Sequence, residues 1–346
     1  MPNKFQELSV TVQIMILKMM SVKVLIILST LSEKMRKVIE FGNIRVRDAV
    51  VEMSDENPYI AVSNHEVTDI VKFRLLSHEH YMRDPDVPSR EQVIDGVRLK
   101  WPVESSNCFL SAVDETPESE IWERIFKYLH SLFRLKKYDV SISQYPLADG
   151  FLWKYEKNLV NLFVCVQEPD LNGDDLEFLF DELTVKNMTI QSAVSQDVEY
   201  KKPLTNQLVI AHNSKWLKFR AVFFSSASQI WLPNTTRTFS GSEMNSLLKY
   251  WVGGGLPNLQ HLEIKTAYRP TLGYSVGFKD RTLSEIETRP WDGQRRPECY
   301  CCINLTRGLD LVNDNGKLAT VLIKRNHFVF IVWPEDVVNP VCTRNT

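Results

Sequence analysis

The chain has 346 residues, more than one typical domain, so we expect a short N-terminal module followed by a larger body. Hydrophobic residues make up 44% of the chain and charged residues 24%, so there is enough apolar side chain for a sizeable core. The formal net charge of -2 creates no long-range field, which argues against nucleic acid and anionic membrane as partners.

The stretch from Leu8 to Leu31 is apolar over a length that could span a bilayer. Lys18 and Lys23 would then lie near the hydrocarbon centre at a cost of about 2.5–3.5 kcal/mol each, and Gln13 adds to the penalty. A signal peptide is not expected either, because no basic leader or small-residue cleavage site flanks a single apolar block. We therefore expect two short helices separated near Ser21, and no membrane segment.

Ser9, Ser21 and Ser32 each precede an apolar run and predict the starts of three short helices. The residues expected to face inward are Val10, Ile14 and Leu17, then Leu25, Leu28 and Leu31, then Met35, Val38 and Ile39. More apolar residues are present than three such helices can bury among themselves, and this surplus consists of Val12, Met15, Ile16, Met19, Val24, Ile26 and Ile27. Helices this short are not stable alone, and the surplus predicts a protein partner.

The run from Phe5 to Ile39 resembles an F-box, with a leucine-led start, two apolar helices, a Leu-Ser step and a basic third helix. Two departures are Ser9, where the family has proline, and Leu31 to Lys34, where it has a Cys-Ser-Lys-Arg-like segment. The resemblance implies docking to a Skp-type adaptor and the cullin ligase core. The implied adaptor-binding residues are Phe5, Leu8, Ser9, Val12, Ile16, Met19, Val24, Ile27 and Leu31. An ordinary helical cap on the next domain is the alternative.

The region from residue 43 to 115 contains strand-like segments that are separated by clusters of Pro, Gly, Asp and Asn. The predicted strands are IRVRDAVVEM from Ile44, YIAVS from Tyr59, TDIVKFRLL from Thr68, VRLKW from Val97 and CFLSAV from Cys108. We therefore expect a β-rich connecting region between an F-box over 1–42 and a body over 116–346.

From residue 116 the pattern changes to alternating helix and strand. Helix starts are predicted at Thr116, at Asn172 and at Ser240, which forms a capping box with Glu243. Six short strands are centred on Val140, Leu162, Met188, Val209, Ile230 and Leu262. Their spacings of 22, 26, 21, 21 and 32 residues compare with about 20–29 for leucine-rich repeats. The alternative is an α/β sandwich without a superhelix.

The fold class that follows is α+β: a small three-helix F-box, then an α/β body of degenerate leucine-rich-repeat-like units with β-rich flanks. The last flank is predicted from INLTRGLDLV, a turn at Asn315-Gly316, KLATVLIKR and HFVFIVWP.

The C-terminal half is similar to the nematode F-box-associated domain (type 2). The motifs that carry the similarity are Trp216-Leu217, Leu247 to Trp251, Leu256 to Leu262, Gly308 to Leu311, Asp314 to Thr320 and Val332 to Pro334. The two resemblances place an F-box first and an associated domain last. This order implies a ligase receptor whose C-terminal part selects an unknown protein substrate. A repeat-type binding scaffold with a decayed F-box is the alternative.

One enzymatic motif competes with this interpretation. Gly273 to Gly277 matches the nucleophile elbow of serine hydrolases around Ser275, with Asp310 and His327 downstream. The context argues against it, because Pro270 interrupts the strand that the elbow needs and His327 lies inside a predicted strand. We therefore expect a non-catalytic protein.

Metal and cofactor sites are not expected. The pairs His65-Glu66 and His78 to His80 lack a further ligand cluster of zinc-like spacing, and Cys299, Cys301 and Cys302 lie too close together for a zinc site. Six cysteines are sparse for this length and favour a reducing compartment, so the expected location is cytoplasmic or nuclear.

Overall fold

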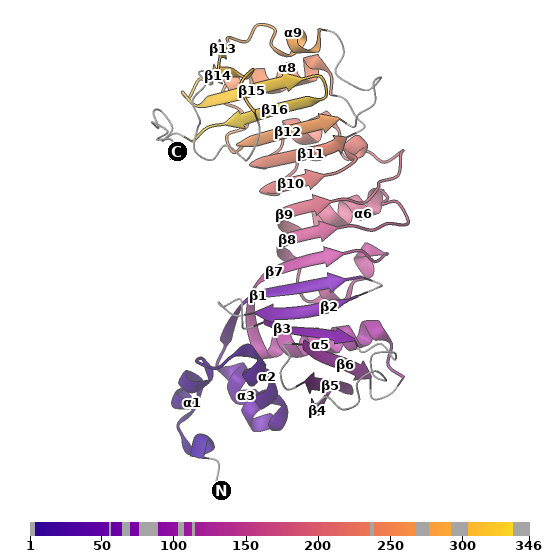
Figure 1. Ribbon diagram of the computed structural model, residues 1–346, viewed down its shortest axis with the longest axis vertical. Coiled ribbons are helices and arrows are strands. Elements are labelled where there is room, and N and C mark those ends of the chain that lie inside the picture. Colours follow the sequence, from indigo (N-terminus) through magenta and orange to yellow (C-terminus); the bar gives the residue numbers. More distant parts are fainter. Residues whose placement is uncertain are drawn as a thin grey trace. The chain divides into compact units, whose positions relative to one another are not determined.

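The computed structural model describes residues 4–54, 57–63, 70–75, 89–102, 107–112, 115–235, 239–266, 277–291 and 304–334 (Figure 1). By its internal contacts the chain divides into two compact units, residues 1–163 and 164–346. Each combines helices with a mixed sheet, so the α+β class is confirmed. The predicted boundaries at 42 and 115 remain predictions.

In the described ranges, the first unit begins with four short helices, of which the last three are each introduced by a serine. They are η1 (Lys4–Glu7), α1 (Val10–Leu17), α2 (Val22–Leu31) and α3 (Glu33–Phe41). The side chains of Ser9, Ser21 and Ser32 each accept a hydrogen bond from the amide three residues ahead, which confirms the three predicted caps. No helix in the described ranges is long and apolar enough to cross a membrane.

The sheet of the first unit has the strand order β8-β7-β1-β2-β3-β6-β5-β4. Its strands are β1 (Ile44–Met53), β2 (Tyr59–Ser63), β3 (Ile70–Leu75), β4 (Ser89–Ile94), β5 (Val97–Pro102), β6 (Asn107–Ala112), β7 (Phe133–Ile142) and β8 (Asn158–Val164). All five strands predicted before residue 115 are present, and β4 was missed. Strand β1 pairs in parallel with β7, whereas β2 lies antiparallel on its other side.

Helix α5 (Glu118–Leu132) covers this sheet, and two 3-10 turns, η2 (Leu147–Asp149) and η3 (Phe151–Lys154), follow β7. The expected cap at Thr116 is wrong, because Pro117 is the N-cap residue and makes no side-chain cap hydrogen bond. Glu118 and Glu120 in the first turn stabilise the helix start through its dipole, as predicted.

The N-terminal helices pack on α5 through polar contacts, one of them buried. The hydroxyls of Ser29 and Tyr128 form a short hydrogen bond, and the Arg36 guanidinium lies over the Tyr128 ring at 4.9 Å from its centre. Ser131 donates a hydrogen bond of 3.3 Å to Glu40. These contacts make α1–α3 part of the first unit.

The predicted inward faces of the first two helices need correction. Val10 and Leu31 are 48% and 67% exposed, whereas Ile26, counted in the surplus, is fully buried. The reason is that α2 contacts strands β3 and β4 as well as α3, so its buried side is wider than one stripe. The buried apolar residues of the three helices are Leu17, Val22, Leu25, Ile26, Met35 and Ile39.

The second unit has the strand order β13-β14-β15-β16-β12-β11-β10-β9. Strands β9 (Thr184–Ile190), β10 (Leu208–Ala211), β11 (Gln229–Thr235) and β12 (His261–Thr266) are parallel. Strands β13 (Arg289–Pro290), β14 (Leu309–Val312), β15 (Leu318–Lys324) and β16 (His327–Val332) continue the sheet antiparallel from β12. All six predicted strand centres from Val140 to Leu262 therefore lie in strands. The leucine-rich-repeat-like character remains a prediction.

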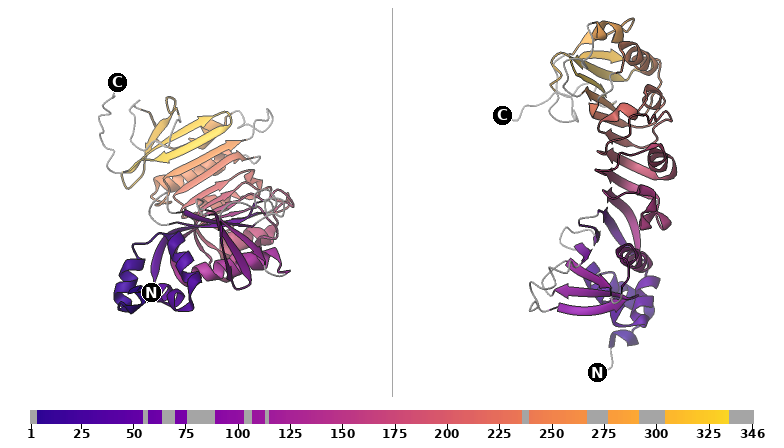
Figure 2. Two further views of the ribbon diagram at one scale, coloured as in Figure 1. Left: turned by 60° about the horizontal axis from the view of Figure 1, so that its bottom comes forward. Right: turned by 90° about the vertical axis from the view of Figure 1, so that its right-hand side faces the viewer.

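The helical segments of this unit lie on one face of its sheet (Figure 2). They are α6 (Gly173–Glu177), its continuation η4 (Phe178–Glu182), η5 (Ser214–Trp216), α7 (Phe219–Phe223), α8 (Gly241–Val252) and α9 (Phe278–Thr282). The capping box of Ser240 with Glu243 is confirmed, and Asn172 forms a second one with Asp175. Trp251 of α8 meets Phe330 of β16 edge to face, with ring centres 5.2 Å apart, which packs helix against sheet.

Candidate protein-interaction surfaces

The nine residues predicted to bind an adaptor all remain accessible in the first unit. Leu8, Val12, Met19, Val24 and Leu31 are 39%, 39%, 88%, 41% and 67% exposed, and Ser9 is also exposed. Phe5, Ile16 and Ile27 are half-buried. We call these nine residues the N-terminal apolar surface. Exposed apolar clusters of this kind mark interaction sites in soluble proteins.

The sequence missed Phe41, which is 76% exposed at the end of α3. It lines a hollow with Val10 and Val38, bordered by the ion pair of Lys37 and Glu33 at 2.8 Å. Phe41 follows the inward Ile39 by two positions, which turns it to the other side of the helix. That spacing is the signal that would have identified it.

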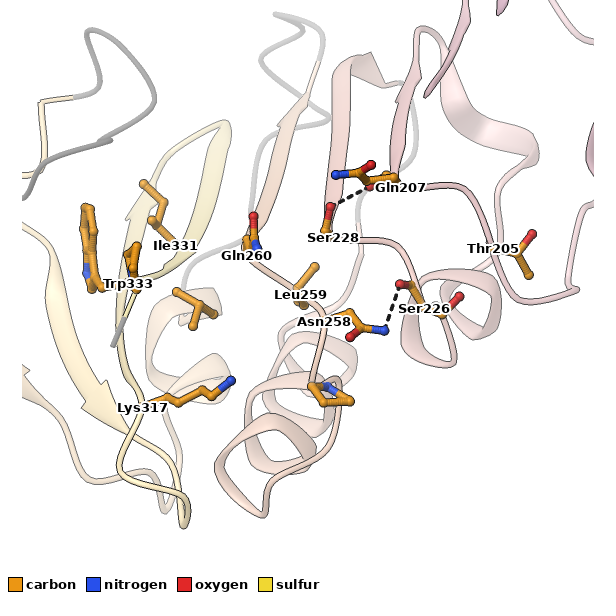
Figure 3. Close-up of a pocket in the computed structure, with 13 residues that line it drawn as sticks. Thr205, Gln207, Ser226, Ser228, Asn258, Leu259, Gln260, Lys317, Ile331 and Trp333 are labelled. Carbon is orange, nitrogen blue, oxygen red and sulfur yellow. Dashed lines mark hydrogen bonds between the residues drawn. The ribbon is translucent and has the colours of Figure 1, made fainter. Parts of the chain in front are cut away.

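A second candidate surface is a pocket of about 750 Å³ in the second unit (Figure 3). It lies where β10, β11 and β12 begin and where β16 ends, so four strands contribute to one edge. Strand pairing sets Leu208 opposite Gln229, Gln229 opposite His261, and His261 opposite Ile331. The residues one position outside these paired residues consequently form a row along the pocket: Gln207, Ser228, Gln260 and Val332.

Main-chain hydrogen bonds hold this row together. The Gln260 amide donates to the Ser228 carbonyl at 2.7 Å, and the Val332 amide donates to the Gln260 carbonyl at 2.8 Å. The Ser228 hydroxyl donates to the Gln207 carbonyl at 2.8 Å. The row therefore has a rigid backbone, and the exposed amide side chains of Gln207 and Gln260 extend from it.

The pocket lining combines polar groups with a buried apolar base. The polar lining residues are Thr205, Gln207, Ser226, Ser228, Asn258, Gln260 and Lys317, and none of the lining residues that the structure describes is acidic. Leu259, Ile331 and Trp333 are buried. The Trp333 indole N–H donates to the Thr320 hydroxyl at 2.8 Å, and Thr320 donates to Asp310 at 2.5 Å. This chain of hydrogen bonds holds the indole in one orientation.

The residues of the hydrolase hypothesis do not assemble in the described part of the chain. Asp310 pairs with Thr320 on β15, and Thr320 pairs with Ile331, four positions from His327 on β16. At about 3.4 Å per residue and about 4.8 Å per strand, Asp310 and His327 are more than 10 Å apart. The Nε2 atom of His327 instead lies 2.8 Å from Glu263. Ser275 lies outside the described residues.

The motifs examined for metal binding lie outside the described residues as well: His65-Glu66, His78 to His80, and Cys299, Cys301 and Cys302. Within the described ranges, no three His, Cys, Asp or Glu side chains are grouped so that they could hold a metal ion.

Comparison with known proteins identifies one region. A family model described as F-box associated matches residues 199–264. No curated protein and no solved structure matches the chain. The matched range contains β10, α7, β11, α8 and most of β12, and with them eight of the pocket-lining residues, from Thr205 to Gln260. Residues 199–264 of this chain are thus similar to the F-box-associated family, and they carry one side of the pocket.

Proposed function

We propose that the protein is the substrate-recognition subunit of an SCF-type E3 ubiquitin ligase. The observation that carries this proposal is the combination of an accessible N-terminal apolar surface with the similarity of residues 199–264 to the F-box-associated family. The N-terminal helices would bind a Skp-type adaptor and so join the cullin ligase core. The second unit would hold a target protein for ubiquitin transfer.

The N-terminal apolar surface supports the adaptor role by its chemistry. Burying Met19, Leu31 and Val24 against a partner removes large apolar areas from water, at about 25 cal/mol for each Å² buried. The helices are held on α5 by Ser29 and Arg36, so the surface is ordered before binding. An ordered surface loses less conformational entropy on association than a mobile segment does.

We further propose that the protein has no catalytic activity of its own and acts in the cytoplasm or nucleus. The ligase would supply the chemistry, and this chain would contribute position and specificity. A serine-directed activity probe tests the first point. We expect no labelling of the wild type, whereas labelling that disappears in Ser275→Ala would establish the hydrolase instead.

A pull-down with purified Skp adaptor tests the receptor role. The wild type should bind, and Leu8→Asp should reduce binding at least about tenfold, because it forces a charge into an apolar interface. The matched control is Val93→Asp, since Val93 is 60% exposed on β4 of the same unit and lies outside the N-terminal apolar surface. This control should bind as the wild type does.

The second hypothesis is a repeat-type protein-binding scaffold whose F-box has decayed. Ser9, at the position where the F-box family has proline, favours it. If the folded wild-type protein fails to bind any Skp adaptor offered, the receptor role is rejected and the scaffold remains.

A further inference from the structure

An exposed aromatic cluster lies at the ends of two helices of the second unit, and we call it the aromatic ledge. It consists of Phe223 and Phe224 at the end of α7 and of Tyr250 on α8. Tyr250 stacks on Phe223 with ring centres 4.9 Å apart and an interplanar angle of 24°, and Phe224 meets Phe223 edge to face. Phe224 is 52% exposed and Tyr250 is 44% exposed.

Gly255 allows the Tyr250 ring to lie against the backbone, because a Cβ at this position would come within 2.6 Å of the ring. The ring is thus held between Phe223 and the chain after α8. Aromatic side chains are enriched in the cores of protein–protein interfaces, and Tyr is enriched among the residues that contribute most to binding. The Arg220 guanidinium, 5.7 Å from the centre of the Phe224 ring, adds a positive charge beside the ledge.

The aromatic ledge adjoins the pocket along the chain. The chain runs from Phe224 to Ser226 on one side and from Gly255 to Pro257 on the other, and Ser226 and Pro257 both line the pocket. The side-chain amide of Asn258 donates to the Ser226 carbonyl at 3.4 Å, which ties the two stretches together. A ligand in the pocket therefore has the ledge within reach along a continuous path.

The chemistry of the pocket favours a peptide over a small molecule. Its volume falls within the range of about 300–1,000 Å³ typical of ligand sites, but those sites are lined mainly by apolar groups. Here the exposed Gln207, Asn258 and Gln260 each offer an amide donor and an amide acceptor. Such groups complement the N–H and C=O groups of an extended main chain.

The charge of the pocket favours a carboxylate on the ligand. Among the described residues that line the pocket, Lys317 is the one that carries a charge, and its side chain points toward Asn258 and Leu259 (Figure 3). Readers of phosphorylated motifs use clusters of arginines that bind the doubly charged group in a forked geometry. A single lysine matches a singly charged Asp or Glu side chain better.

We propose that this surface binds an extended, unmodified peptide segment of the target. An acidic side chain of the segment lies at Lys317, its main chain crosses the Gln207, Asn258 and Gln260 amides, and a large apolar or aromatic side chain rests on the aromatic ledge. This inference rests on the proposed function, which supplies the target protein as the partner. It adds the class of segment that is recognised.

The test uses the full-length protein and a positional-scanning library of fluorescent nonapeptides, with affinity measured by fluorescence polarisation. Peptides with Glu fixed at one position should bind about two- to fivefold tighter than those with Gln, as expected for a half-exposed ion pair. Lys at that position should bind more weakly still. Phe or Leu at a second position should be preferred over Ala.

Three variants assign these preferences to the surface. Lys317→Glu should reverse the Glu preference into a Lys preference, and Lys317→Gln should leave no preference between Glu and Lys. Tyr250→Ala should remove the aromatic preference and leave the Glu preference unchanged. The matched control is Lys324→Glu, the same charge change at an exposed residue of β15 that does not line the pocket. It should behave as the wild type.

The proposal is overturned if no library position shows a preference, if Lys317→Glu keeps the wild-type preferences, or if Lys324→Glu alters them equally. Phosphoserine binding more than tenfold tighter than Glu would replace the carboxylate with a phosphorylated motif and would also overturn it. These outcomes are separate from the adaptor pull-down, since the peptide assay contains no adaptor. Failure here with intact adaptor binding leaves the receptor role standing, and failure of the pull-down alone leaves the peptide site standing.

Discussion

The carboxylate of Glu263 on β12 lies 2.8 Å from Nε2 of His327 on β16, at the junction of the parallel and antiparallel parts of the second sheet. The other carboxylate oxygen lies 3.4 Å from Nε2 of His261, which is fully buried. The imidazoles of His261 and His327 lower the pKa of Glu263 to about 2. His327, the histidine of the hydrolase motif, therefore has a structural partner in Glu263.

Glu263→Gln should destabilise the protein at neutral pH by about 1–2 kcal/mol, because it removes a charge-assisted contact. The lowered pKa of Glu263 means that this stabilisation is complete above the ordinary value of 4.5 and is lost as the pH falls toward about 2. Urea unfolding at pH 7, 4.5 and 2.5 should show the difference between wild type and variant shrinking. Glu287→Gln, at an exposed carboxylate, is the control and should match the wild type. A difference independent of pH would contradict the assignment.

Tyr128→Phe should loosen the N-terminal helices from α5. The Ser29 hydroxyl donates to the Ile26 carbonyl at 2.6 Å, so the Tyr128 hydroxyl is the donor in the buried Ser29–Tyr128 hydrogen bond. Its loss leaves a buried acceptor without that donor and should cost about 1–2 kcal/mol of unfolding free energy. Tyr250→Phe, at an exposed tyrosine, should cost less than about 0.5 kcal/mol in the same thermal unfolding measurement. Equal effects of the two substitutions would argue against a specific role for the Ser29 contact.

Met19→Asp and Leu17→Asp should separate binding from folding. Met19 is 88% exposed, so its substitution should change stability by less than about 0.5 kcal/mol while lowering adaptor binding at least about tenfold. Leu17 is fully buried, and a carboxylate there should unfold the N-terminal helices, visible in circular dichroism. A Met19→Asp protein that is folded and still binds the adaptor fully would remove Met19 from the interface.

Ser9→Pro should preserve both fold and adaptor binding. Ser9 has φ -59° and ψ 149°, close to the proline geometry of about -65°, and it precedes the first residue of α1. The lost Ser9 cap costs roughly 0.5–2 kcal/mol, and the stiffer unfolded chain restores about 0.4–1 kcal/mol. Titration with the adaptor should therefore give an affinity within about threefold of the wild type. A large loss of affinity in a folded Ser9→Pro protein would mean that the serine hydroxyl itself takes part in binding.

Local features of this protein were predictable because neighbours in the chain determine them. A serine at Ser9, Ser21 or Ser32 can satisfy an amide three residues ahead whatever the distant structure does, and all three caps are present. Strand Ile44–Met53 begins and ends where the sequence predicted, and strand Leu208–Ala211 contains the predicted centre Val209. Residue Thr116 is the exception, since the helix there starts after Pro117.

Only the tertiary structure decided which apolar side chains are exposed and which residues come together in the pocket. Which apolar residues of the N-terminal helices are covered depends on the strands and on α5 beside them, so Ile26 is buried and Leu31 is exposed. The pocket depends on the register of four strands, which brings Gln207, Gln260 and Val332 together from distant parts of the chain. The sequence by itself determined the elements and their order, because those arise from local hydrogen bonding and periodicity. The surfaces exist only after elements far apart in the chain have packed.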